Sequence, residues 1–219
     1  MSYAVYHSEK GAISSGGIGK HIDREKGAEH TYRHADPERL HLNENILVNE
    51  HCSKALHKAI SDRIEQGYNS RNKAGELKAI RKDAVKYTTH IFSGSHEQMK
   101  KIEADPKLRK AWIDKNLEFA KKEFGEKNIV RFSIHRDEKT MHIHAITIPL
   151  TQDGRLSAKE VLGGRKEMSE RQDRYATAMK EFGLERGERA TGIKHENARD
   201  YYARIEKAQN SINESDFKA

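Results

Sequence analysis

Three histidines in the middle of the chain, His135, His142 and His144, have the types and spacing of a metal site. In a β-strand alternate side chains share a face, so His142 and His144 would project together, about 7 Å apart along the strand. β-Branched and aromatic residues flank a polar connection at 136–141, a pattern that predicts a hairpin. That hairpin would bring His135, at the end of its first strand, beside the other two imidazoles. Three converging imidazoles favour a metal site over three separate, solvated histidines.

A metal held by three neutral imidazoles keeps open positions that can polarise a phosphoryl oxygen or activate a water molecule. In-line attack on a phosphodiester then needs a nucleophile on the opposite side. His21 is one candidate, because it follows a glycine-rich loop at 11–19. The other candidates are the eight tyrosines: Tyr3, Tyr6, Tyr32, Tyr68, Tyr87, Tyr175, Tyr201 and Tyr202.

Arg24 lies three positions after His21. If residues 20–26 form a helical turn, the two side chains share a face, and the guanidinium would hold the phosphate that the imidazole attacks. The alternative is a solvated surface turn. Glu138 and Glu44 are the carboxylates best placed to orient or deprotonate such a histidine.

The balance of charge favours a polyanionic partner. Lys and Arg number 41 against 34 Asp and Glu, which gives a formal net charge of +7, and such an excess suits nucleic acid. Residues 71–86, which lead into an expected strand, form the segment most suited to DNA phosphates. The basic residues expected to bind DNA are Arg24, Arg71, Lys73, Lys78, Arg81 and Lys82.

Composition excludes several other classes of protein. No apolar run approaches the roughly 18 residues that span a bilayer, and the N-terminal segment does not resemble a signal peptide. The single Cys52 rules out an internal disulfide and suits a reducing compartment. These features predict a soluble, cytoplasmic protein without membrane contact.

Around the hairpin, the pattern predicts an α+β fold, a central antiparallel sheet of about five strands with helices packed on it. Strands are expected at 3–6, 41–48, 84–92, 129–134 and 142–148, and helices at 54–66, 106–124, 156–162 and 167–182. We expect one catalytic domain over residues 1–193. Residues 194–219 are strongly polar and are expected to form a helix or linker with few packing partners.

The sequence resembles the relaxases of the MobV (Pre/Mob) group, which are plasmid mobilisation proteins of the HUH endonuclease class. Three blocks carry the resemblance: Lys20–Arg24, Leu42–Glu44 followed by Arg81–Val85, and the motif His135-x-Asp-Glu-x-x-x-His-x-His144. Gly183–Gly187 is similar to the end of that domain, so the resemblance runs from residue 2 to about 200. Where many members have proline before the second histidine of the motif, this chain has methionine.

The resemblance implies an activity that the residues alone do not: site- and strand-specific nicking and rejoining of DNA at a plasmid origin of transfer, to initiate conjugative mobilisation in bacteria. It implies that His21 attacks and stays joined to the 5′ phosphate, with Arg24 on the phosphate and Glu138 assisting. The hairpin histidines would bind one divalent cation, Mn²⁺ or Mg²⁺. The DNA partner would be the single-stranded nick site with its adjacent hairpin, and a C-terminal region beyond this chain would dimerise.

Three alternatives remain open from the residues. A rolling-circle replication initiator would use the same histidine site with a tyrosine nucleophile. A DNA-binding repressor of its own promoter would need no catalysis. A zinc hydrolase would act on a small molecule, whereas the relaxase would have no small-molecule substrate.

Overall fold

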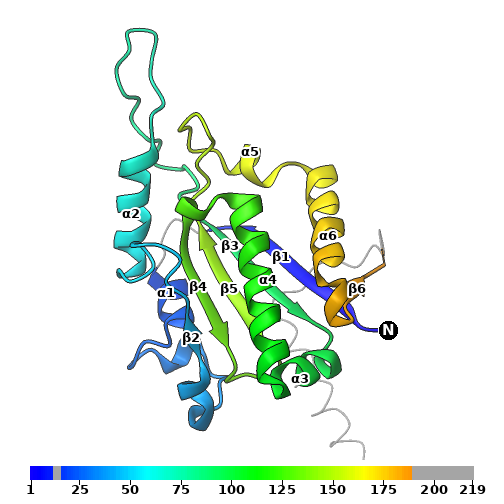
Figure 1. Cartoon of the computed structure of the whole chain (residues 1–219). Coiled ribbons are helices and arrows are strands. Elements are labelled where there is room, and N and C mark those ends of the chain that lie inside the picture. The colour runs from blue at the N-terminus through cyan, green and yellow to red at the C-terminus, as the bar shows by residue number, and fades with distance from the viewer. Residues whose placement is uncertain (12–15, 189–219) are drawn as a thin grey trace, which may run out of the picture. The chain divides into compact units, whose positions relative to one another are not determined.

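A six-stranded sheet with the order β2-β4-β5-β3-β1-β6 forms the centre of the fold (Figure 1). The computed structural model describes residues 1–11 and 16–188. The strands are β1 Tyr3–Lys10, β2 Glu44–Asn45, β3 Thr88–Gly94, β4 Ile129–His135, β5 His142–Thr147 and β6 Glu185–Arg186. Each pair of neighbours is antiparallel except β1 and β6, which are parallel. The expected α+β class is confirmed, and the short β6 is the strand that the sequence did not predict.

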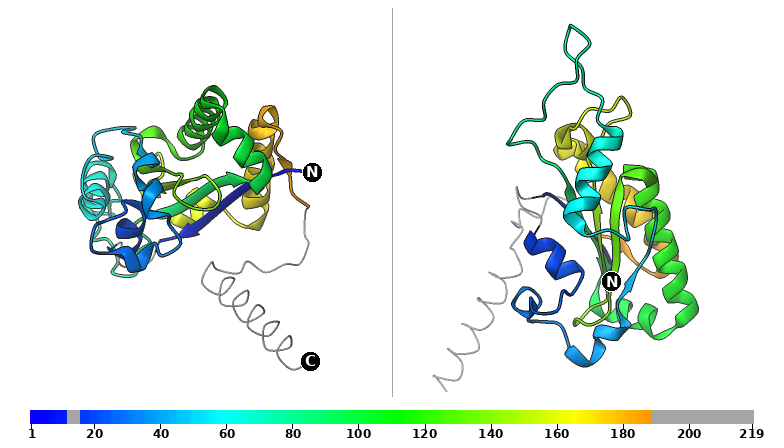
Figure 2. Two further views of the ribbon diagram at one scale, coloured as in Figure 1. Left: turned by 90° about the horizontal axis from the view of Figure 1, so that it is seen from below. Right: turned by 90° about the vertical axis from the view of Figure 1, so that its left-hand side faces the viewer.

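Helices cover both faces of the sheet and bury a separate apolar cluster on each. α1 Gly16–Ile22 and α2 Leu56–Gly67 pack on one face. The helices on the other face are α3 His96–Ala104, α4 Pro106–Phe124 and α6 Arg165–Met179. Viewed from the side, α1 and α4 lie on opposite sides of the strands (Figure 2). A five-residue helix, α5 Ala158–Leu162, precedes α6.

Local sequence determines where α4 begins and ends. Asp105 accepts hydrogen bonds from the backbone N–H groups of Lys107 and Leu108, and Pro106 occupies the first turn, where its missing N–H costs nothing. Gly125, with φ of 81°, ends the helix in a conformation that other residues adopt at a cost. The predicted helix 106–124 is therefore confirmed at both ends.

The expected strand at 41–48 is wrong for most of its length. Asp36 caps a 3-10 helix at Pro37–Leu42 by accepting a hydrogen bond from the backbone of Glu38. Only Glu44–Asn45 pairs with β4. The first two residues of the expected strand therefore belong to the 3-10 helix, and the β-branched Ile46 and Val48 lie beyond the end of β2.

Other boundaries also moved. β3 begins at Thr88 rather than at residue 84, and α2 begins at Leu56, with no side-chain cap from Ser53. The connection between α2 and β3, residues 69–86, projects from the body as a long loop that we call the finger (Figure 1). Within the finger, Arg71 and Leu77 pair in an isolated antiparallel β-bridge.

Residues Met1–Gly187 form one compact unit. The expected helix or linker at 194–219 lies outside the described residues, as does the end of the expected 1–193 domain. Among the helices that the structure describes, none has the length and apolar character needed to cross a bilayer.

Candidate active site

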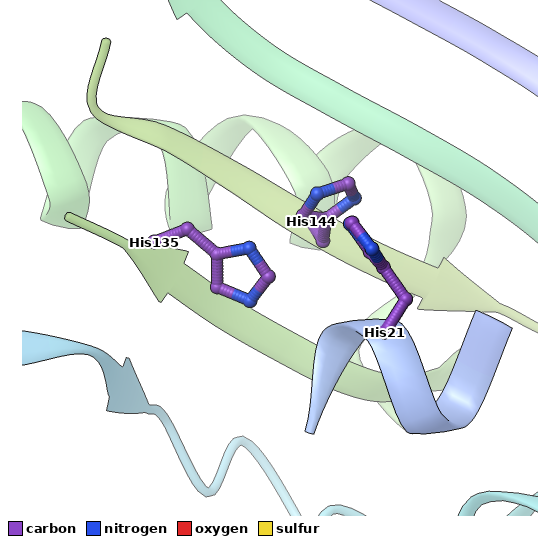
Figure 3. A group of neighbouring side chains, drawn as sticks. All are labelled: His21, His135 and His144. Carbon is purple, nitrogen blue, oxygen red and sulfur yellow. The ribbon is translucent and has the colours of Figure 1, made fainter. Parts of the chain in front are cut away.

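Four histidines converge on one face of the sheet. His135 ends β4, His142 and His144 lie on β5, and His21 lies in the last turn of α1. The ring centroids of the three hairpin histidines are 4.7–5.2 Å apart. The His21 ring lies 5.9 Å from that of His135 and 5.3 Å from that of His144, and Figure 3 shows these three rings turned towards one another.

The register of the β4–β5 hairpin explains the convergence. His135 is directly opposite His142, and Ser133 is opposite His144. Directly opposed residues of antiparallel strands point to the same face, and so do residues two apart on one strand. The hairpin thus brings together the three histidines that the sequence placed in one metal site.

Backbone carbonyls fix the ring orientation of three of the histidines. His135 donates from Nε2 to the carbonyl of Ile22 at 2.9 Å, and His142 donates from Nδ1 to the carbonyl of Thr140 at 2.9 Å. His21 donates from Nδ1 to the carbonyl of Thr31 at 2.7 Å. A ring nitrogen that donates leaves the other nitrogen of a neutral imidazole with a free lone pair, which is the usual arrangement of a metal-bound histidine.

The free nitrogens fit a divalent cation. Nδ1 of His135 is buried and has no hydrogen-bond partner among the described residues. Nε2 of His142 and Nε2 of His144 lie 3.0 Å apart, close to the separation of two nitrogens that each bind one metal ion at about 2.0–2.1 Å. The donor set of imidazoles, with the Glu138 carboxylate close to His135 and His142, accepts manganese, iron or zinc.

His21 also lies within reach of this set. One ligand atom from each of His21, His135 and His144 falls within 4.8 Å of the others, as do those of His135, Glu138 and His142. The Nε2 lone pair of His21 therefore has two chemical uses, as a further ligand or as a nucleophile beside the metal. The geometry alone does not separate the two.

Burial favours the neutral form of His21, His135 and His144. It lowers the pKa of His135 to about 3, and positive charge on His142 and Arg24 adds to the effect. Burial and the neighbouring histidines hold the pKa of His144 well below its usual value. Burial also lowers the pKa of His21, whereas its hydrogen bond to Thr31 opposes that shift. Neutral imidazoles are the form that binds a metal or attacks phosphorus.

An ion-pair network ties α1 to the hairpin connection. Arg24 donates from Nε and Nη2 to the two oxygens of Asp137 at 2.7 and 2.8 Å, and from Nη2 to Glu138 at 2.8 Å. Its Nη1 donates to the carbonyl of His21 at 2.9 Å. Arg24 does not share a helical face with His21, because α1 ends at Ile22 and Arg24 has a left-handed φ of 49°.

Asp137 and Asn43 also belong to the site, although they were not among the site residues predicted from the sequence. Asp137 is fully buried, and Asn43 donates from Nδ2 to its carboxylate at 2.7 Å while accepting from the backbone N–H of Arg136. Burial acts to raise the pKa of Asp137, but hydrogen bonds from Arg24 and Asn43 outweigh it and lower the pKa. The only signal in the sequence was their presence in two of the blocks that carry the resemblance.

Glu44 lies apart from the cluster. It is exposed on β2, and its carboxylate lies 4.0 Å from Nη1 of Arg136. It is absent from both groups of metal-competent ligands among the described residues. The geometry therefore favours Glu138 over Glu44 for orienting His21.

Three of the described tyrosines direct their hydroxyls away from the histidine cluster. Tyr6 donates to His90 in the opposite layer, and burial raises its pKa to about 12. Tyr175 donates to Asn116 within the core, and Tyr32 donates to the backbone of Glu25. Tyr201 and Tyr202 lie outside the described residues.

The expected DNA-binding residues fall into two places. Arg24 is in the ion-pair network, where only 7% of its side chain is exposed. The other five lie exposed on the finger: Arg71, Lys73, Lys78, Arg81 and Lys82.

The chain is similar to known proteins over most of its length. The family model described as plasmid recombination enzyme (Mob_Pre) matches residues 1–203. The chain belongs to this family. A type 3 plasmid recombination enzyme from Staphylococcus aureus is 33% identical over 94% of the chain and 49% of its own length. A 65 kDa protein from Zymomonas mobilis is 31% identical over 94% of the chain and 33% of its own length.

Solved structures of another family member have the same fold. The relaxase domain of MobM, bound to plasmid pMV158 oriT DNA in an Mn-bound crystal structure, is 28% identical with a TM-score of 0.80. The match covers 93% of this chain and 99% of that domain. The chain thus spans about half the length of the Staphylococcus Mob_Pre enzyme, but nearly all of the MobM relaxase domain.

Proposed function

We propose that this Mob_Pre chain is a relaxase domain that nicks and rejoins one DNA strand at a plasmid origin of transfer. The observation that carries the proposal is the histidine cluster, in which free imidazole nitrogens from β4, β5 and α1 face one another. The MobM relaxase domain, of the same fold, was crystallised with oriT DNA and Mn. Because the relatives are plasmid enzymes of bacteria, we place the activity in the bacterial cytoplasm.

His135, His142 and His144 would hold the cation, Mn²⁺ or Mg²⁺. When bound, a divalent cation polarises the scissile phosphate and offsets the charge that develops on its oxygens. The buried, unpartnered Nδ1 of His135 supports this assignment, since a buried polar atom without a partner is costly unless a ligand satisfies it.

His21 would attack the phosphorus through Nε2. The N–P bond forms as the P–O3′ bond breaks, and the released 3′ oxygen takes a proton to leave as a hydroxyl. The ring then carries positive charge, which the carbonyl of Thr31 stabilises through the Nδ1–H bond. Rejoining is the reverse reaction, with the 3′ hydroxyl attacking the phosphorus and His21 leaving.

Arg24 and Glu138 would position this nucleophile. Arg24 binds the His21 carbonyl with one nitrogen and two carboxylates with the others. The resemblance implies that Arg24 also contacts the phosphate. In that case the phosphate and Asp137 would bind the same guanidinium. The Glu138 carboxylate favours the protonated form of His21, so it would stabilise the charge that forms on attack.

The finger would bind the DNA backbone outside the reacting phosphate. Its exposed basic side chains are suited to phosphate contacts, which dominate affinity and depend on salt. A single-stranded nick site with an adjacent hairpin, as the resemblance implies, supplies such a backbone.

The test is nicking of supercoiled plasmid that carries the cognate origin, with Mn²⁺ present. Wild-type protein should convert it to the open circle, and His142→Ala should not. DNA binding without nicking by the wild type would favour the repressor alternative. A covalent adduct on a tyrosine would favour the rolling-circle initiator.

A further inference from the structure

A cavity of about 800 Å³ lies between α2 and the finger, and its lining includes His57 but none of the four active-site histidines. Its volume falls in the range of small-molecule and nucleotide sites. Apolar and aromatic side chains line it, and most of its exposed surface is apolar. These residues are Ile60, Ile64, Tyr68, Leu77, Ile80 and Tyr87.

The rim of this cavity is strongly basic. Four cations, Lys78, Arg81, Lys82 and Lys86, stand against one carboxylate, Glu65. Arg81 pairs with Asp83 at 3.3 Å, but within the part of the chain that the structure describes the three lysines form no ion pair. The rim therefore presents uncompensated positive charge around an apolar floor.

Leu77 is a large apolar residue on the exposed surface of the finger. Its side chain lies on the finger with 56% of its surface exposed, at the edge of the cavity. A large apolar residue among lysines covers no core of its own, so it is suited to contact with a ligand that is both apolar and anionic.

The cavity belongs to the same layer as the active site. Its floor residues Ile60, Ile64 and Tyr87 pack in one apolar cluster with Ile22 and Ile146. Ile22 follows His21 in the chain, and Ile146 shares a face of β5 with His144, two residues away. The cavity and the histidine cluster therefore open from the same side of the sheet.

We propose that this pocket captures an unpaired base of the DNA strand, while the rim lysines bind the phosphates on either side of it. An apolar and aromatic floor stacks on the face of a base, and a basic rim attracts the backbone, the two features of single-strand binding sites. Because the floor offers few hydrogen-bonding groups, the pocket accepts different bases. The inference rests on the proposed function, since it assumes that DNA is the substrate.

The test compares a labelled oligo(dT) with an abasic oligonucleotide of the same length, using fluorescence anisotropy and the full chain. Wild-type protein should bind the base-containing strand about fivefold or more tightly than the abasic one, the effect of a single base stack. Leu77→Ala should reduce this preference several-fold. Leu47→Ala is the matched control, because Leu47 is also exposed, at 64%, but lies next to β2.

The rim is tested separately through salt dependence. Lys82→Ala should weaken the binding of both strands and make the logarithmic salt slope shallower by about one. Lys107→Ala, an exposed lysine at the start of α4 on the other face, should leave the slope unchanged. If Leu77→Ala leaves the base preference at the wild-type value, the pocket does not hold a base and the inference is wrong.

The same preparation separates this inference from the proposed function. If the wild type nicks plasmid but Leu77→Ala does not change the base preference, the base-binding pocket is wrong and the relaxase function stands. A Leu77-dependent base preference in a protein that nicks no plasmid overturns the relaxase function and leaves the pocket standing.

Discussion

Arg24 and Asp137 are 113 residues apart in sequence and form a two-pronged ion pair in the structure, Nε–Oδ2 at 2.7 Å and Nη2–Oδ1 at 2.8 Å. Both side chains are almost fully buried, with 7% and 0% of their surface exposed. Through Nη1, Arg24 also holds the carbonyl of His21. The pair fixes the end of α1 against the hairpin connection, and so it positions His21 relative to the hairpin histidines.

The first prediction concerns this pair. Arg24→Lys and Asp137→Asn should each lower the nicking rate by about 100-fold, because small misplacements of a nucleophile are costly. The double variant should be little worse than either single one, since both act through the same contact. Single-turnover nicking measures the rates, and thermal melting checks that the variants fold.

The matched control is Arg155→Lys. Arg155 also bonds two carboxylates, Asp153 and Glu160, but on the surface, where ion pairs contribute little. This variant should nick like the wild type. Additive losses for Arg24→Lys and Asp137→Asn would contradict a positioning role and favour direct contact of Arg24 with the phosphate.

The second prediction separates ligands from nucleophile. Mn²⁺ should raise the melting temperature of the chelator-stripped protein, because it binds only the folded site. His142→Ala should abolish this shift, whereas His21→Ala should keep most of it. Differential scanning fluorimetry across a Mn²⁺ titration measures both. Equal losses in the two variants would make His21 a fourth ligand.

The third prediction ranks the two carboxylates. Glu138→Gln should lower the nicking rate by about 100-fold, the scale of a lost acid–base partner. Glu44→Gln should change the nicking rate by less than about twofold. Glu44 is exposed and its ion pair with Arg136 is long, at 4.0 Å, and exposed ion pairs contribute little. Nicking rates for the two variants under identical metal concentrations decide between them. The reverse order would assign the carboxylate role to Glu44.

The fourth prediction concerns stability and rests on His90, which lies in the opposite layer. Its ring is fully buried, accepts from Tyr6 and bonds Thr88 and Thr147. Burial lowers its pKa to about 3. Between that value and about 6.5 the unfolded chain binds the proton more readily, so His90 destabilises the fold as pH falls through this window.

His90→Gln removes that titration. Between about pH 7 and pH 5 the wild type should lose roughly 2 kcal/mol more unfolding free energy than this variant. Urea denaturation at the two pH values, with a chelator present, measures the difference. Parallel losses in the two proteins would show that His90 is not held neutral by the fold.

Period-two spacing, together with β-forming segments on both sides of a polar connection, was enough to predict the hairpin and the meeting of its three histidines. The pairing of His135 with His142 follows from residues only seven positions apart, within one local element. The Arg24–Asp137–Asn43 network was beyond such reasoning, because it depends on how α1 and the 3-10 helix at Pro37–Leu42 pack against the hairpin. The expected strand at 41–48 was wrong for a related reason, since its first two residues belong to that 3-10 helix.

The position of His21 needed both kinds of information. Nothing in its spacing distinguishes it from a solvated residue, and its link to the hairpin came from the resemblance. In the structure, its Nδ1 is fixed by Thr31 and its ring lies 5.3 Å from that of His144. Tertiary packing, rather than local pattern, makes it a candidate nucleophile.

The chemistry of the covalent adduct tests most directly whether His21 is the nucleophile. The protein is incubated with a single strand that spans the cognate nick site, and the adduct is mapped by mass spectrometry before and after mild acid. His21 as the nucleophile predicts a 5′ phosphate on the peptide that contains His21, lost in acid because a phosphohistidine bond is acid-labile, and no adduct with His21→Ala. An adduct that survives acid on a tyrosine peptide, or one that forms in His21→Ala, would contradict it.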